Sequence, residues 1–523
     1  MNAVAIELRR AGWSSHAGVW ARGDPVLDGG PATAADVARA LSSGQPLPRL
    51  VRRLGGSFAL VVRDGPTVHA VVDRVRSIPL YYATDRARSL VSDDPYWIRD
   101  QLAPEDDDAE VRAEFLLTGY VTGADTLAPS VKQVRAGEMV VLAPVDGRAR
   151  LAAERWFVFW PVTRDVPADL DRLVDSWDAV LGRVLSRVAG SARDRTLVVP
   201  LSGGGDSRTI AAGLREAGHP DIRCFTYGGA DSAEVRRARD VAQRLGLPWT
   251  WVPYDRARWA RWSLTSEWHA YPRFADGLSS LEHRQDWPAV WELRKSGTLP
   301  PDAIFVPGHA LDFLGGSHLP VRRSNPGADR AALETEIWHH HYRLWRGTPG
   351  ERALARARLR RSLVELPAEG ADDVRSSLES WNWQERQAKF IANAVRVYEF
   401  WGYEWRLPFW DAEVVDFWAA VPPALRHRSM LLRSALKRQA ARLGLPEPLE
   451  PPAATLRGAA RLMAPTATDI AARMIRRARR RHEYFEHPMG WYGAVPWPVF
   501  RELYTGAEDV ASFVARERAG RRA

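Results

Sequence analysis

The pattern of apolar and polar residues predicts that the first 160 residues form a β-rich domain with some helix. Short runs of β-branched and aromatic residues cover 56–64, 67–74, 78–84 and 138–144. The first two runs are separated by Gly65 and Pro66, a strong turn signal. One helix is expected among these strands, over 34–44.

The pattern changes after Pro167. Over 169–190 the apolar residues recur at helical spacing and form one stripe: Leu170, Leu173, Val174, Trp177, Val180, Leu181, Val184 and Leu185. Apolar strands at 196–201, 222–229 and 248–254 then alternate with helices at 209–218 and 230–246. This alternation predicts an α/β fold with a doubly wound parallel sheet in a second domain, 168–523. Beyond Asp255 we expect added helices and one further strand at 303–308.

Composition narrows the class of protein. The chain has 523 residues, which suggests two to four domains, and a net charge of +9. That charge fits an anionic ligand such as a nucleotide, or simply an arginine-rich composition. The single cysteine, Cys224, excludes a disulfide within the chain and predicts a buried, inert thiol in a strand. The 23 tryptophans either line a substrate groove or pack helices. No secretion signal or membrane span is recognisable, so we expect a cytoplasmic protein without a membrane partner.

The segment 197–208, LVVPLSGGGDSR, carries the strongest chemical signal. A strand ends at Leu201, and a helix is expected to begin near Ser207. Glycines allow the backbone N–H groups to approach a ligand, and the positive end of a helix favours an oxyanion such as pyrophosphate. The residues expected to bind ATP and its pyrophosphate are Ser202, Gly203, Gly204, Gly205, Asp206 and Ser207. Neither the Walker pattern nor the dinucleotide GxGxxG pattern is present. The alternative is an ordinary glycine-rich turn.

Three segments together resemble a known family. SGGGDS resembles the SGGxDS loop of the N-type ATP pyrophosphatases, or adenine nucleotide alpha hydrolases. IFVPGHALDFLGG, at 304–316, looks like the family segment SGxGxDxxxGG, and YEWRLPFWD, at 403–411, is similar to EARxPFxD of asparagine synthases. The order and spread of the three segments identify the chain as resembling the asparagine synthase family.

This resemblance implies an ATP-dependent amide-forming ligase that adenylates a carboxylate and releases pyrophosphate. Asp206 and Asp312 would bind Mg²⁺, the ion that accompanies ATP. Glu404 matches the family glutamate implicated in proton transfer from the amine. His309, three residues before Asp312, could form a dyad with a carboxylate or could be a plain core or capping histidine.

The front domain resembles the glutamine-hydrolysing, Ntn-hydrolase-like half of asparagine synthase. The active form needs a cysteine directly after the initiator Met, and this chain has Asn2. We therefore expect no glutaminase activity, as in lasso-peptide cyclases and β-lactam synthetases. The amine would come from ammonia, from a separate ammonia- or precursor-delivering protein, or from the substrate itself. A peptide, a β-amino acid or a sugar carboxylate are the substrate classes left open.

One feature leaves another interpretation open. The late basic loop of the family normally offers a lysine, whereas the segment 446–462 of this chain offers only Arg457 and Arg461. An arginine can supply charge but cannot transfer a proton. The competing interpretation is a catalytically weakened nucleotide-binding scaffold. Nucleic acid is not an expected partner, because no RNA-binding module is evident.

Overall fold

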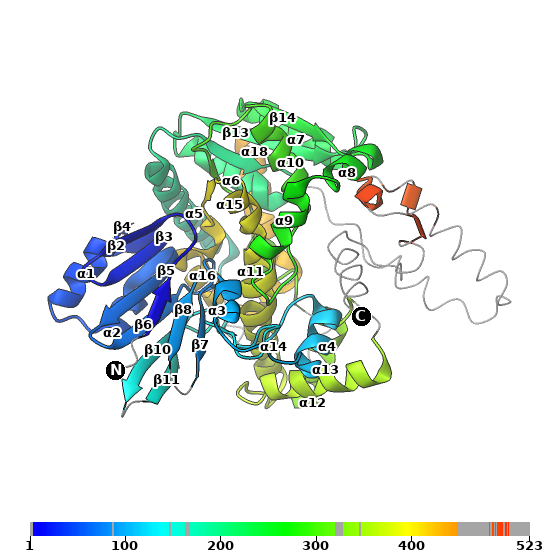
Figure 1. The fold of residues 1–523 in the computed structure, drawn as a ribbon. Helices are drawn as coiled ribbons and strands as arrows, with labels where there is room; N and C mark the ends of the chain where they lie inside the picture. Colours follow the sequence, from blue (N-terminus) through cyan, green and yellow to red (C-terminus); the bar gives the residue numbers. More distant parts are fainter. Residues whose placement is uncertain are drawn as a thin grey trace.

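The computed structural model describes residues 4–85, 88–145, 148–162, 168–319, 328–344 and 347–447, together with isolated residues between 481 and 500. Its strands form three sheets, two built before residue 160 and one built after residue 190 (Figure 1). The fold is therefore of the expected α/β class, with a β-rich front region and a parallel back sheet. The exact domain limits at 160 and 168 stay a prediction.

The front region contains a seven-stranded sheet and a four-stranded sheet. The larger sheet has the order β11-β10-β6-β5-β3-β2, with β4 paired to β3, and the smaller has the order β1-β8-β7-β9. The strands are β1 Ala5–Glu7, β2 Trp13–His16, β3 Val19–Leu27, β4 Gly30–Pro31, β5 Leu54–Asp64, β6 Thr67–Val72, β7 Tyr81–Thr84, β8 Ser89–Ser92, β9 Lys132–Gln133, β10 Glu138–Val145 and β11 Arg148–Arg155. Four helices accompany them: α1 Ala34–Ser42, α2 Leu47–Arg53, α3 Pro95–Asp100 and α4 Ala109–Thr118.

Strand β5 shows why these layers form. Its side chains alternate between two faces, as in any strand. Phe58 and Leu60 join the core with α1 and α2, whereas Ala59 and Val61 join the core that contains Tyr82 of the smaller sheet. Both faces of β5 are thus buried, which explains its continuous apolar sequence.

The back sheet is parallel throughout, with the order β14-β13-β12-β15-β16. Its strands are β12 Leu197–Pro200, β13 Ile222–Gly228, β14 Trp249–Pro253, β15 Ile304–Phe305 and β16 Glu404–Trp405. The first four confirm the predicted strands, whereas β16 was not predicted because two residues are too short for a pattern. The chain leaves β12 toward β13 and β14, and later adds β15 and β16 on the other side of β12.

Helices lie around this sheet and also away from it, beside α4, as Figure 1 shows in teal, green and yellow. They are α5 Leu170–Ala192, α6 Gly205–Glu216, α7 Ala233–Leu245, α8 Arg256–Trp262, α9 Ser266–Ala275, α10 Trp287–Lys295, α11 Leu311–Leu314, α12 Arg330–His341, α13 Pro349–Ser362, α14 Ala371–Asn382, α15 Arg396–Phe400, α16 Ala412–Ala420, α17 Pro423–Arg426 and α18 Met430–Leu443. A π-helix, η1 Trp383–Ile391, continues from α14. Short 3-10 turns are η2 Ala392–Val395, η3 Pro408–Trp410, η4 His427–Ser429 and η5 Trp491–Ala494.

Tryptophans pack these added helices together. Trp259 lies edge-to-face on Trp262 and Trp268, and Trp268 lies edge-to-face on Trp287, with ring centroids 5.3–5.9 Å apart. The prediction that tryptophans pack helices, and do not line a substrate groove, is confirmed for these four rings. Cys224 is buried in β13, as predicted, and burial raises the pKa of its thiol to about 12.

Buried ion pairs join the front region to the back region. Glu399 of α15 lies 3.0 Å from the Arg22 guanidinium of β3 and 2.7 Å from that of Arg396. Although burial raises the pKa of Glu399, the charges of Arg22 and Arg396 lower it to about 2. The carboxylate is thus ionised and shared between the two regions.

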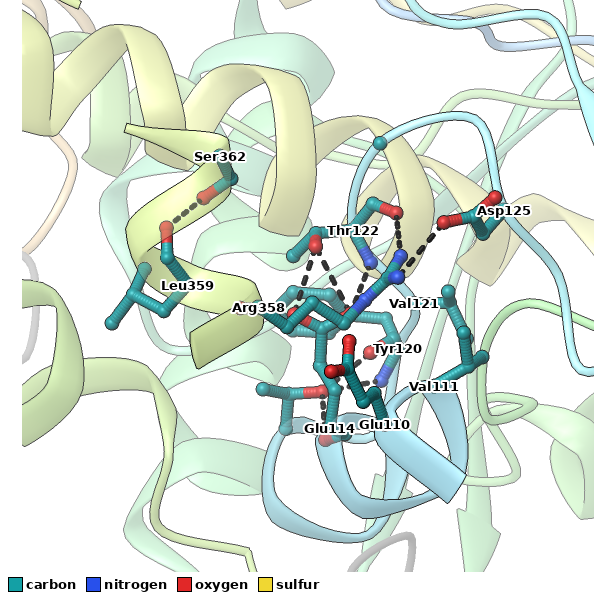
Figure 2. A network of polar contacts seen from close by, with 12 residues as sticks. Glu110, Val111, Glu114, Tyr120, Val121, Thr122, Asp125, Arg358, Leu359 and Ser362 are labelled. Atoms are coloured by element: carbon teal, nitrogen blue, oxygen red, sulfur yellow. Dashed lines mark hydrogen bonds and ion pairs between the residues drawn. The ribbon is translucent and has the colours of Figure 1, made fainter. Parts of the chain in front are cut away.

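A second polar network lies where α4 meets α13 (Figure 2). The Glu114 carboxylate accepts hydrogen bonds from Arg358 Nε at 2.7 Å, Tyr342 Oη at 2.9 Å and the backbone N–H of Thr122 at 2.8 Å. Arg358 also contacts Asp125 at 2.8 Å. Glu114 has no exposed surface, so the front region supplies most of the counter-charge for a buried arginine of the back region.

Candidate functional site

The candidate site lies at the carboxyl edge of the back sheet, beside its central strand. In doubly wound sheets, ligands bind where successive connections leave a central strand in opposite directions. Here β12 lies between β13 and β15, so the loops after β12 and β15 emerge side by side at such a point. These loops contain SGGGDS and PGHALD.

The loop after β12 turns directly into α6. Gly204 is the N-cap of this helix, in an extended conformation and without a side-chain cap. The hydroxyl of Ser207 accepts a hydrogen bond from the backbone N–H of Ser202 at 2.9 Å and lies 3.0 Å from the hydroxyl of Ser202. The helix begins at Gly205, two residues earlier than predicted, so Asp206 and Ser207 both lie in its first turn. Uncapped first-turn N–H groups are suited to a phosphate oxygen.

Two glycines allow the close approach of neighbouring segments to this loop. A Cβ atom on Gly308 would lie 2.7 Å from the backbone nitrogen of Ser207 and 3.0 Å from the carbonyl carbon of Asp206. A Cβ atom on Gly205 would lie 2.6 Å from Leu436 of α18. The segment after β15 therefore packs backbone-to-backbone on the SGGGDS loop.

This packing brings the two predicted metal ligands together. The backbone N–H of Asp312 donates a hydrogen bond to the Asp206 carboxylate at 3.1 Å. Burial and the neighbouring charge of Asp312 raise the pKa of Asp206 well above its usual range. Although its recessed position raises the pKa of Asp312, a 3.3 Å contact with His318 and the charge of that ring lower it. The Asp312 side chain keeps 58% of its surface accessible to solvent.

Two adjacent carboxylates suit a divalent cation. Mg²⁺ is commonly bound by one or two carboxylates plus substrate phosphates and water. No group of three or more potential metal-ligating side chains occurs in the described part of the chain, so a complete protein-only metal site is not seen there. The carboxylate pair fits an ion that arrives with the nucleotide.

His309 lies in the same segment, between Gly308 and Asp312. Its Nδ1 atom is enclosed by protein and has no hydrogen-bond partner in the residues that the structure describes. Burial lowers the pKa of His309, while the charges of Asp286 and Asp312 act in the opposite direction. The ring is therefore neutral near pH 7 and can accept a proton.

Comparison with known proteins agrees with this geometry. A family model described as asparagine synthase matches residues 187–262 and 270–480, more than half of the chain. The chain belongs to the asparagine synthase family. A 53-residue stretch is also 53% identical to a 7-cyano-7-deazaguanine synthase of Synechococcus sp. (strain RCC307), which covers 10% of this chain and 24% of that protein.

The structure does not bring Glu404 next to the carboxylate pair, and its catalytic role stays a prediction. In this member of the asparagine synthase family, Glu404 pairs in register with Ile304, and Ile304 pairs with Leu197 at the start of β12. The SGGGDS loop follows the opposite end of β12, which places Glu404 roughly 13 Å or more along the strand direction from it. The Glu404 carboxylate instead lies 2.8 Å from Arg195.

The segment that begins at Glu404 connects the two regions of this asparagine synthase family member. Arg406 lies 3.0 Å from Asp24 of β3, and Asp411 lies 3.0 Å from Arg187 of α5. Arg406 and Asp411 of this motif thus join neighbouring elements of the structure.

Several residues near the site were not predicted. Asp286, ahead of α10, accepts hydrogen bonds from Tyr227 at 2.6 Å and Tyr398 at 2.8 Å. His283 is buried near His309, and burial together with the charge of His309 lowers its pKa to about 4. The Gln-Asp and Glu-His pairs around 282–286 carry no recognisable pattern, so only the tertiary structure reveals them.

Some predictions fall outside the described residues, namely Asn2, Arg457 and Arg461. Among the residues that are described, no helix combines the length and apolar character needed to cross a bilayer.

Proposed function

We propose that this protein uses ATP and Mg²⁺ to activate a carboxylate as an acyl-adenylate and then joins the acyl group to an amine. The observation that carries this proposal is the 3.1 Å hydrogen bond that places Asp312 against Asp206, beside the uncapped first turn of α6. A bound Mg²⁺ would neutralise charge on the ATP phosphates and polarise them.

In the first step, a carboxylate oxygen of the substrate attacks the α-phosphorus of ATP. The bond between the α-phosphorus and the bridging oxygen breaks, and pyrophosphate leaves with that electron pair. The N–H groups of Asp206 and Ser207 are positioned to hold an oxyanion there.

In the second step, the amine nitrogen attacks the acyl carbon, AMP leaves, and the nitrogen loses a proton. His309 is the proposed proton acceptor, because its ring is neutral near pH 7 and lies in the segment that carries Asp312. The amine source is ammonia, a delivering protein, or an amine on the substrate. A peptide, a β-amino acid and a sugar carboxylate remain the proposed substrate classes.

The test is AMP and pyrophosphate formation from Mg–ATP in the presence of fractionated metabolite and peptide extracts. Wild type should form both products with at least one fraction, and Asp206→Asn should reduce the rate roughly 100-fold or more. Asp372→Asn is the matched control, because this aspartate is exposed in the first turn of α14. Binding of ATP without AMP formation in any fraction would instead support the nucleotide-binding scaffold.

A further inference from the structure

The π-helix η1 brings one arginine to the edge of the proposed site. π-helices are rare and occur often at functional sites. The ring of Trp383, at the start of η1, lies 6.3 Å from that of Phe313, the neighbour of Asp312. The ring of Phe390, near its end, lies 4.2 Å from that of His283. Arg386 lies between these two contacts, one turn before Phe390.

Arg386 has no counter-ion in the described part of the chain. It is half-buried, and no hydrogen bond or ion pair to its guanidinium is present among the described residues. The acids nearest to it in the fold have other partners. Glu385 pairs with Lys389 at 2.5 Å, and Asp312 contacts His318. By contrast, Arg187, another half-buried arginine, pairs with Asp411 at 3.0 Å.

Two ionisable groups near Arg386, His283 and His341, are neutral near pH 7, because burial lowers the pKa of both rings. The charge of Arg386 reaches Asp312, His283 and His341. Of these groups only Asp312 is an acid, and it faces Asp206 and His318. A partly desolvated guanidinium without a counter-charge is unfavourable, and a bound anion would remove this cost. Arginine binds carboxylates and phosphates through two parallel hydrogen bonds.

We infer that Arg386 binds an anionic oxygen group of a reactant, either the substrate carboxylate or an ATP phosphate, beside Asp206 and Asp312. This inference rests on the proposed function for the identity of the reactants. The π-helix fixes the backbone of Arg386, and its planar guanidinium group supplies the N–H donors.

The experiment compares wild type with Arg386→Gln, Arg386→Lys and the control Arg239→Gln, an exposed arginine on α7. Calorimetry measures the affinity of each protein for Mg²⁺ with α,β-methylene-ATP, which needs no turnover. Separately, the extract fraction that supports AMP formation in wild type is titrated to give its half-saturating concentration. Thermal unfolding confirms that each variant is folded, and Arg386→Lys keeps the charge if Arg386→Gln does not fold.

We expect Arg386→Gln to weaken one of these two interactions tenfold or more, and Arg386→Lys to weaken it less. A weaker nucleotide affinity identifies a phosphate as the ligand, whereas a higher half-saturating concentration with unchanged nucleotide affinity identifies the carboxylate. Unchanged values in both measurements overturn the inference. If wild type forms no AMP, the proposed function fails, and the nucleotide titration alone then decides the role of Arg386.

Discussion

The backbone N–H of Asp312 lies 3.1 Å from the carboxylate of Asp206, although the two residues come from loops that follow different strands. This hydrogen bond fixes the separation of two carboxylates that would otherwise repel each other. The arrangement is unfavourable for the free protein, since the pKa of Asp206 is raised well above its usual range by burial and by Asp312. The arrangement of the two carboxylates becomes favourable only when a bound cation neutralises their charge.

We expect Asp206→Asn to stabilise the free protein while it removes activity. A carboxyl with a raised pKa is less stable when charged, so its unfavourable contribution grows as pH rises from the ordinary value of 3.8 toward the raised value. The neutral amide avoids this cost, by about 1 kcal/mol or more near pH 7. Thermal unfolding at pH 7 without Mg²⁺ measures the effect. A lower unfolding temperature for Asp206→Asn would contradict this account of the pair.

Gly308→Ala should displace the SGGGDS loop. The added Cβ atom would lie 2.7 Å from the backbone nitrogen of Ser207, and backbone cannot move aside as a side-chain end can. We expect a loss of about 1–3 kcal/mol in the free energy of unfolding and a large loss of AMP formation. Gly182→Ala in α5 is the control, because nothing lies within 4 Å of its new Cβ atom, and it should stabilise by about 1 kcal/mol.

Glu404→Gln should have little effect on either activity or stability. The Glu404 side chain is 53% exposed, and its ion pair with Arg195 lies at the opposite end of the sheet from Asp206. Exposed ion pairs contribute about 1 kcal/mol or less. We expect AMP formation within about twofold of wild type. A loss of amide formation with normal adenylation would restore the catalytic role that the sequence indicated.

Glu399→Gln should remove a pH-dependent part of the stability. The pKa of Glu399 is lowered from 4.5 to about 2, so its stabilising contribution is present above 4.5 and is lost as pH falls from there toward 2. This contribution is about 3 kcal/mol. Denaturant unfolding at several pH values should show a shallower decline for the variant below pH 4.5, starting from a lower stability at pH 7. Parallel curves for the two proteins would contradict the assigned shift.

The sequence was sufficient where the informative residues are neighbours in the chain. Gly204, Gly205 and Asp206 lie at one junction between a strand and a helix, so this glycine-rich turn and its acid could be predicted together. The alternation of strands and helices from 196 to 254 likewise specified a parallel sheet, because each element is long enough to show its own period.

The register of the short strands and the burial of individual side chains could not be predicted from the sequence in this way. Glu404 matches a family motif, but its position depends on which residue of β15 pairs with it, and the two-residue strand β16 leaves no period to detect. Arg386 has no motif at all. Arg386 could be singled out only from the tertiary structure. There, η1 places it near Asp312 and His283, and the nearby acids pair with other residues.

The Glu114–Arg358 network has a consequence for how the chain unfolds. If the front region opened alone, Arg358 would lose Glu114 and Asp125, and Lys389 would lose the carbonyl groups of Val121 and Gly123. Partial opening would break these contacts and expose the hydrophobic core that residues of both regions share. The two halves should therefore melt in one cooperative transition, in which the front half stabilises the back half.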